Sequence, residues 1–173
     1  TVQAINFLFK KGHQVIGMIN GPEKLRASKE RKEGYIQAMT KSRLKFDPSL
    51  IVNTDLNSAS ILEATKELLS SKRKPTAIVT FNDYVALDAI KYARLQKLRI
   101  NKDISFVSYS NQPWNTYSAF PPLASVEQFP YLQGQKAAET LLELFNKKES
   151  ETENNHAYYR IILDSQLVLN HTK

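Results

Sequence analysis

Five polar side chains follow short apolar runs of the chain, and their types suit the binding of a small molecule. Arg31 stands near the start of one predicted helix, Asn82 follows a predicted strand, Ser110 and Asn111 follow another, and Gln128 follows a short extended piece. An arginine offers a fixed fork of donors, and an asparagine amide both donates and accepts. This inventory suits a polyhydroxylated or carboxylated ligand that is bound without bond-making. For each residue taken alone, a structural role as surface charge, helix cap or loop residue stays open.

Other kinds of site find little support. The 173 residues include no cysteine, which excludes thiolate metal sites, disulfides and cysteine nucleophiles. The three histidines, His13, His156 and His171, stand far apart without metal-ligand spacing. Asp83 and Asp88 are five positions apart and so do not share a helix face, and neither a dinucleotide fingerprint nor a phosphate loop is present. We therefore expect no cofactor, no metal and no catalytic residue, and we do not expect an enzyme.

The net charge of +7 lies entirely in the first quarter of the chain. Residues 1–46 hold 10 Lys and Arg against 3 Asp and Glu, whereas residues 47–173 hold 14 of each kind. A basic patch could bind nucleic acid. The alternative is that these bases cover the solvated faces of two helices. We favour the second interpretation, because acids and aromatics interleave and no recognition motif accompanies the bases.

No apolar run approaches the roughly 20 residues that a membrane span needs. The first apolar stretch is followed, not preceded, by Lys10 and Lys11, which is unlike a signal peptide. With the absence of cysteine, this favours a cytoplasmic protein and no membrane partner.

Strands and helices are predicted to alternate along the chain. Short apolar runs predict strands over 15–19, 50–52, 76–81, 104–109, 123–126, 158–163 and 166–169. Helical spacing and capping residues predict helices over 1–12, from Ser28 to about 43, from Ser60 to about 74, from Asn82 or Asp83 to about 93, and over 130–147. Central strands that are continuously apolar are typical of a parallel sheet with helices on both faces, so the predicted fold class is α/β. Ligands bind beyond the carboxyl ends of such strands.

Six segments between residues 11 and 142 form an ordered series of motifs. They read KGHQVIGMING at 11–21, S-x-x-R-x-x-G-Y-x-x-A at 28–38, PTAI followed by FND-x-x-A at 75–86, DISFVSY at 103–109, PPLASVEQ at 121–128 and G-x-x-AA-x-x-LL at 134–142. In this order the series resembles the LacI/GalR family, the bacterial sugar-responsive transcription repressors.

The resemblance implies a periplasmic-binding-protein-like fold, in which two α/β subdomains enclose an effector cleft and a helix-turn-helix precedes them. On that basis, residues of about 13–126 and 155–173 would form mainly the C-terminal subdomain. Residues 1–12 and 127–148 would belong to the N-terminal subdomain. The chain would then be a fragment without the helix-turn-helix and the first part of the N-terminal subdomain.

The resemblance also implies roles for the polar side chains. Arg31 would contact effector hydroxyls or a carboxylate, and Asn82 would add an amide contact. Ser110 and Asn111 would line the floor of the site, and Gln128 would lie at a crossover between the subdomains.

Two positions add to or depart from this pattern. Leu56 occupies a place where relatives often put an aromatic that packs on the ligand, although an apolar contact of a capping loop is an equally open interpretation. The family usually has Gly-[Phe/Tyr]-Asp-[Asp/Asn] where this chain has Ser108-Tyr109-Ser110-Asn111. Ser110 thus replaces an Asp that typically accepts sugar hydroxyls, and a hydrogen bond to a charged group is the stronger kind. We therefore expect the ligand to be bound differently here.

The function implied is ligand sensing by a DNA-binding transcriptional regulator: a sugar or sugar-derivative effector closes the cleft and alters operator affinity. DNA would be bound only through the helix-turn-helix. The alternative is a sugar-binding protein of a transport system, and an upstream helix-turn-helix or secretion signal in the gene would decide between the two.

We predict self-association to a homodimer, because the predicted helices over 1–12 and 130–147 carry apolar stripes that would lack a partner. Light scattering at high protein concentration measures this directly, and a monomeric mass would contradict it.

Overall fold

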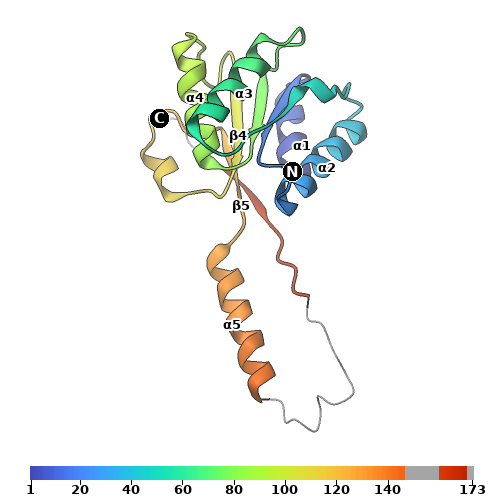
Figure 1. Ribbon diagram of the computed structural model, residues 1–173, viewed down its shortest axis with the longest axis vertical. Helices are drawn as coiled ribbons and strands as arrows, with labels where there is room; N and C mark the ends of the chain where they lie inside the picture. Colours follow the sequence, from blue (N-terminus) through green and yellow to red (C-terminus); the bar gives the residue numbers. More distant parts are fainter. Residues whose placement is uncertain (147–159, 171–173) are drawn as a thin grey trace. The chain divides into compact units, whose positions relative to one another are not determined.

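The computed structural model describes residues 1–146 and 160–170 (Figure 1). The chain divides into two compact units. The first comprises Thr1–Glu127 and Leu167–Lys173, and the second comprises Gln128–Gln166. The predicted site residues other than Gln128 all lie in the first unit.

A six-stranded sheet forms the centre of the fold. Its order is β2 (Ile51–Asn53), β1 (Ile16–Asn20), β3 (Ala77–Thr80), β4 (Ser105–Tyr109), β5 (Ala124–Glu127) and β6 (Gln166–Leu169). The pairs β1–β2, β1–β3, β3–β4 and β4–β5 are all parallel. Every residue of β1, β3 and β4 is buried. This confirms the parallel sheet that the continuous apolar runs predict.

Helices cover both faces of the sheet. Helices α1 (Val2–Lys10) and α2 (Arg26–Lys41) share one buried cluster that includes Val79 of β3. Helices α3 (Ser58–Ser70) and α4 (Asp83–Leu95) share a second cluster that includes Ile78. Because successive strand residues point to opposite faces, β3 contributes to both clusters. The predicted α/β class with two covered faces is confirmed.

Helix α1 packs within the first unit, and the assignment of residues 1–12 to the N-terminal subdomain stays a prediction. Its side chains Ala4, Ile5 and Leu8 are completely buried in the first unit, in the same cluster as Tyr35 of α2. The apolar stripe of α1 therefore has a partner within this chain. It no longer supports self-association, since only Phe9 among its large apolar residues remains well exposed.

Three helix starts are refined by the structure. Asn57 caps α3, its Oδ1 accepting from the Ser60 backbone N–H at 2.9 Å, so the start predicted at Ser60 is wrong and the helix begins at Ser58. Asn82, not Asp83, caps α4. Helix α2 begins two residues before Ser28, which is buried in its first turn instead of capping it.

The end of the chain differs in one respect. Residues 160–163 form no strand, and the rest of the strand predicted over 158–163 lies outside the described residues, as do His156 and His171. Strand β6 confirms the strand predicted over 166–169. In the second unit, α5 (Pro130–Asn146) confirms a helix, and its side chains are all at least partly exposed.

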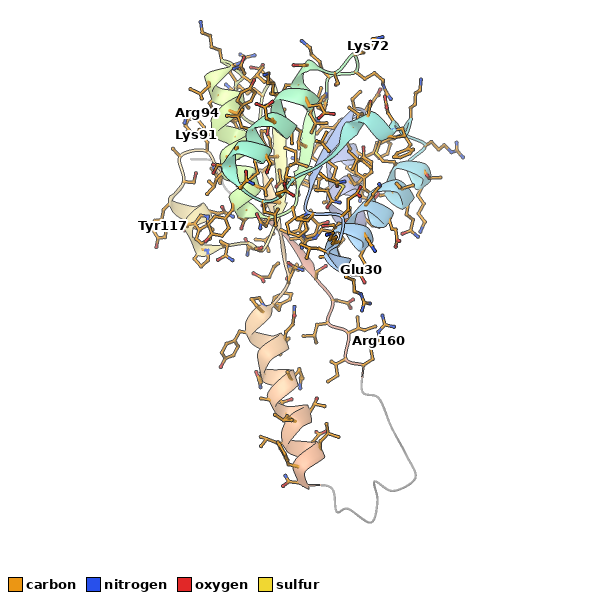
Figure 2. The ribbon with its side chains drawn as sticks, in the orientation of Figure 1. Glu30, Lys72, Lys91, Arg94, Tyr117 and Arg160 are labelled. Carbon is orange, nitrogen blue, oxygen red and sulfur yellow. The ribbon has the colours of Figure 1, made fainter. Side chains whose placement is uncertain are left out.

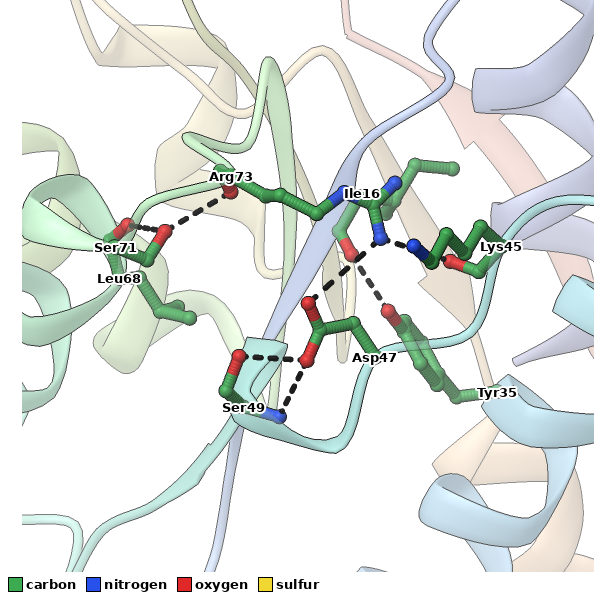
Figure 3. A network of polar contacts seen from close by, with 8 residues as sticks. All are labelled: Ile16, Tyr35, Lys45, Asp47, Ser49, Leu68, Ser71 and Arg73. Atoms are coloured by element: carbon green, nitrogen blue, oxygen red, sulfur yellow. Dashed lines mark hydrogen bonds and ion pairs between the residues drawn. The ribbon is translucent and has the colours of Figure 1, made fainter.

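A polar network ties α2 and the segment after it to the sheet (Figure 3). The Tyr35 hydroxyl donates to the Ile16 carbonyl at 2.6 Å, and burial raises the pKa of Tyr35 well above its ordinary range. Asp47 accepts from the backbone N–H of Ser49 and lies 3.7 Å from the guanidinium of Arg73. Together these contacts fix the position of α2, which carries the first predicted site residue.

His13 makes stability depend on pH. Its Nδ1 lies 2.9 Å from Oγ1 of Thr76, just before β3, and burial lowers the pKa of His13. The unfolded chain therefore binds more protons at His13 than the folded chain, so stability falls as pH drops through the ordinary histidine value of about 6.5 toward the lower folded pKa.

We expect the melting temperature to fall between about pH 7.5 and about pH 5.5, and to fall less in His13→Asn. Thermal unfolding followed by circular dichroism measures both slopes. Equal slopes in the two proteins would show that His13 does not contribute.

Candidate ligand-binding site

The candidate site lies at the carboxyl ends of β1, β3 and β4, where a parallel sheet gathers the loops that follow its strands. In Figure 2, Glu30 near the start of α2 marks this edge of the first unit, and Lys72, after α3, marks the opposite edge. Arg31 comes from α2, Asn82 follows β3, and Ser110 and Asn111 follow β4.

Arg31 reaches from α2 across the ends of two strands. Its guanidinium carbon lies 4.2 Å from the ring centroid of Phe81 and 4.1 Å from that of Tyr109. Its Nη1 donates to the Phe81 carbonyl at 2.7 Å. Burial lowers the pKa of Arg31, yet an arginine stays protonated in proteins. The two rings and the carbonyl therefore hold a half-buried cation at the sheet edge.

The two rings were not predicted as part of the site. Phe81 is 8% and Tyr109 4% exposed, and the sequence alone favours core packing for such aromatics. The Tyr109 hydroxyl donates to Oγ1 of Thr1 at 2.5 Å, and burial raises the pKa of Tyr109. One signal was present: each aromatic ends a predicted strand directly before a predicted site residue, Asn82 or Ser110.

Ser110 and Asn111 form a tight turn with an unusual backbone. Their φ angles are +95° and +48°, the left-handed region that non-glycine residues seldom adopt. The Ser110 N–H donates to the Val126 carbonyl at 3.1 Å, and Nδ2 of Asn111 donates to Oε2 of Glu127 at 3.0 Å. The Asn111 amide is thus partly engaged, and the neighbouring strand β5 fixes the turn.

Asp83 is a second feature that the sequence interpretation missed. Its carboxylate is completely buried and accepts from Oγ of Ser108, from Oγ of Ser125 at 3.2 Å and from the backbone N–H of Gln112 at 2.6 Å. Ser125 in turn accepts from Nδ2 of Asn170 at 3.2 Å. The carboxylate therefore connects α4, β4 and β5 and holds the far side of the Ser110–Asn111 turn.

Leu56 and Asn82 line the same hollow, of about 330 Å³, beside the start of α4. Leu56 has a φ of +62°, and Oδ1 of Asn82 accepts from the Val85 N–H at 3.0 Å as the helix cap. The capping role of Asn82 is thus observed. Its Nδ2 makes no hydrogen bond within residues 1–146 and 160–170, which leaves that donor available to a ligand.

Gln128 belongs to the second unit, where its carbonyl accepts from Nε2 of Gln133 at 2.5 Å. Its part in ligand binding stays a prediction. In the described part of the chain, no group of three or more His, Cys, Asp or Glu side chains could hold a metal ion, and no helix there is long and apolar enough to cross a membrane.

Comparison with known proteins agrees with this architecture. Residues 5–162 match the family described as "Periplasmic binding protein-like domain". The repressor CytR of Escherichia coli (strain K12) is 32% identical over 140 residues, covering 81% of this chain and 41% of CytR. The repressor PurR of Aliivibrio fischeri (strain MJ11) is 35% identical over 150 residues, covering 86% of this chain and 44% of PurR.

Solved structures give the same result. A LacI-family regulatory protein from Chloroflexus aggregans superposes with a TM-score of 0.87 at 30% identity, over 99% of this chain and 59% of that one. A complex of the transcriptional regulator CelR with cellobiose superposes with a TM-score of 0.86 at 26% identity, over 99% of this chain and 50% of CelR.

The chain therefore belongs to the periplasmic binding protein-like domain family, and within it to the effector-binding domains of the LacI/GalR transcriptional regulators. It spans about two fifths of the length of the curated repressors that it matches.

Removal of the Asp83 carboxylate should destabilise the fold. In Asp83→Ala, the hydroxyls of Ser108 and Ser125 and the N–H of Gln112 lose a buried acceptor, and we expect the free energy of unfolding to fall by about 2–4 kcal/mol. Urea denaturation measures the change.

The matched control is Asp88→Ala on the same helix, whose carboxylate is half-buried and makes no hydrogen bond or ion pair within the described residues. Its effect should stay within about 0.5 kcal/mol. A similar loss in both variants would contradict a special role for Asp83.

Proposed function

We propose that this chain is the ligand-sensing part of a bacterial DNA-binding transcriptional regulator, and that its effector is a sugar or sugar derivative bound beyond β3 and β4. In the parent protein, a helix-turn-helix would bind the operator. The effector would close two subdomains over itself and so change the affinity for DNA.

One observation carries the proposal: Arg31 presents unused donors at the carboxyl edge of a parallel sheet, where ligands of such folds bind. An arginine has five N–H donors, and a single hydrogen bond of Arg31, to the Phe81 carbonyl, is found among the described residues. Asn82 and the Ser110–Asn111 turn add amide and hydroxyl groups close along the same edge. Such groups bind polyols without attacking them.

The relatives support a regulatory role for this binding. CytR and PurR are transcriptional repressors, and the CelR structure holds cellobiose. A ligand changes the balance between two states only through its differential affinity for them. An effector must therefore bind the closed arrangement more tightly than the open one for operator affinity to change.

A sugar-binding protein of a transport system is the alternative that shares this fold. The repressor relatives, at 32–35% identity over four fifths or more of the chain, favour the regulator. On the same basis we propose a cytoplasmic parent protein that forms a homodimer. The proposal of a homodimer now rests on the exposed apolar side chains of α5, which are Leu141, Leu142 and Phe145.

Arg31→Ala in the parent regulator should abolish the response to effector and leave operator binding intact. The substitution removes the fork of donors, whereas the DNA-binding segment is untouched. Fluorescence anisotropy measures operator binding with and without a crude extract of polysaccharide hydrolysate as the effector source. The two measurements give the operator affinity and its response to effector.

Lys29→Ala is the matched control, because Lys29 is an exposed cation two positions earlier on α2. It should respond as the unmodified protein does. A full effector response in Arg31→Ala would show that the site lies elsewhere.

A further inference from the structure

We propose that the effector carries an anionic group, a carboxylate or a phosphate, and that Arg31 binds this group. The inference rests on the proposed function, since it names the charge class of the ligand at that same site. It follows from the charges that surround Arg31 and from the replacement at position 110.

Arg31 is a half-buried cation that has no acidic partner among the residues that the structure describes. The ion pairs found among the described residues join Arg26 with Glu30, Lys66 with Glu63, Arg73 with Asp47, Arg99 with Asp103 and Lys136 with Glu139. None of them includes Arg31. Burial is the main influence on the pKa of Arg31, and it acts against the charged form. A buried charge without a counter-charge is unfavourable unless a partner neutralises it.

Two carboxylates near the turn that follows β4 are engaged by other groups of the protein. Asp83 is enclosed by the donors of Ser108, Ser125 and Gln112. Glu127 accepts from the Asn111 amide. The donors around the Asp83 carboxylate are all neutral, so this buried carboxylate is held by the protein and not by Arg31.

The contacts of Arg31 also leave N–H groups of its guanidinium available to a ligand. Aromatic faces within about 4 Å attract a guanidinium, and they orient its plane. They do not occupy its N–H groups, and the Phe81 carbonyl takes one. A planar fork of free N–H donors matches the paired oxygens of a carboxylate or phosphate, and hydrogen bonds of this charged kind are the strong ones.

Ser110 removes the negative charge that the family usually places here. It directly follows Tyr109, whose ring lies against the guanidinium, and its turn is fixed from β5. A carboxylate at this position would balance Arg31 and repel an anionic ligand. A serine hydroxyl does neither, so the residue at this position does not oppose an anionic group at Arg31.

The test compares matched ligands that differ in charge. Isothermal titration of the parent regulator with D-gluconate and with glucose 6-phosphate is set against D-sorbitol and D-glucose, their neutral counterparts. Inorganic phosphate separates a free anion from a sugar phosphate. We expect at least one anionic sugar to bind about tenfold or more tightly than its neutral counterpart, and to weaken as NaCl rises from about 20 mM to about 500 mM.

Two variants address the cause of this preference. Ser110→Asp restores the usual family residue, and Arg31→Gln removes the cation. Each should weaken the anionic ligand by about tenfold or more. Lys29→Gln removes an exposed cation from the same helix and should change its affinity by less than about twofold. Circular dichroism melting curves confirm that each variant is folded, and Arg31→Gln keeps the test valid if Ser110→Asp fails to fold.

The inference is overturned if the neutral sugars bind as tightly as the charged ones, if Ser110→Asp and Arg31→Gln both leave the anionic affinity unchanged, or if the parent regulator binds none of the anions. Tight binding of a neutral sugar that Arg31→Gln weakens would leave the proposed function standing and remove only the anionic inference. Failure of the proposed function itself shows separately, as an operator response that Arg31→Ala does not change.

Discussion

The parallel pairing of β1, β3 and β4 is the constraint on which the candidate site depends. It places the carboxyl ends of these strands at one edge, so residues that are some 50 or more positions apart come together there. Phe81 directly follows β3 and Tyr109 ends β4, and α2, which follows β1 in the chain, places the Arg31 guanidinium against both rings. The pairing needs buried apolar strands, and the chain supplies them in β1, β3 and β4.

Precision at this edge comes from a second, buried layer of polar contacts. The Asp83 carboxylate binds two strands and the turn after β4 at once, and Asn82 fixes the start of α4. The Asp83 carboxylate has its hydrogen bonds supplied by the protein, whereas a single hydrogen bond of Arg31 is found among the described residues. This difference matters for function. The contacts of Asp83 hold the geometry of the edge, and the remaining N–H donors of Arg31 can bind a ligand. The two rings partly offset the free-energy cost of burying the guanidinium, and a bound anion would offset it further.

The sequence predicts the fold better than it predicts the site. Continuous apolar strands and helical stripes are local signals, and they identify the parallel sheet and its two covered faces. The ring contacts of Arg31 depend on how β3 and β4 align, which no local pattern specifies. Asp83 shows the same limit: it stands next to a helix cap in sequence, and only the tertiary structure brings Ser108 and Ser125 to it. Helix α1 shows a related limit, since its apolar stripe alone does not specify that it packs against α2 and β3.

The chain is related to the LacI/GalR regulators, and its candidate site contains the positive charge of Arg31. We expect the Arg31 guanidinium to contact an anionic group of the effector. A crystal structure of the parent regulator with bound D-gluconate or glucose 6-phosphate would reveal this contact. A carboxylate or phosphate oxygen should lie within hydrogen-bond distance of the Arg31 guanidinium, with both rings in place. A ligand whose charged group points away from Arg31, or one that binds at another edge of the sheet, would contradict it.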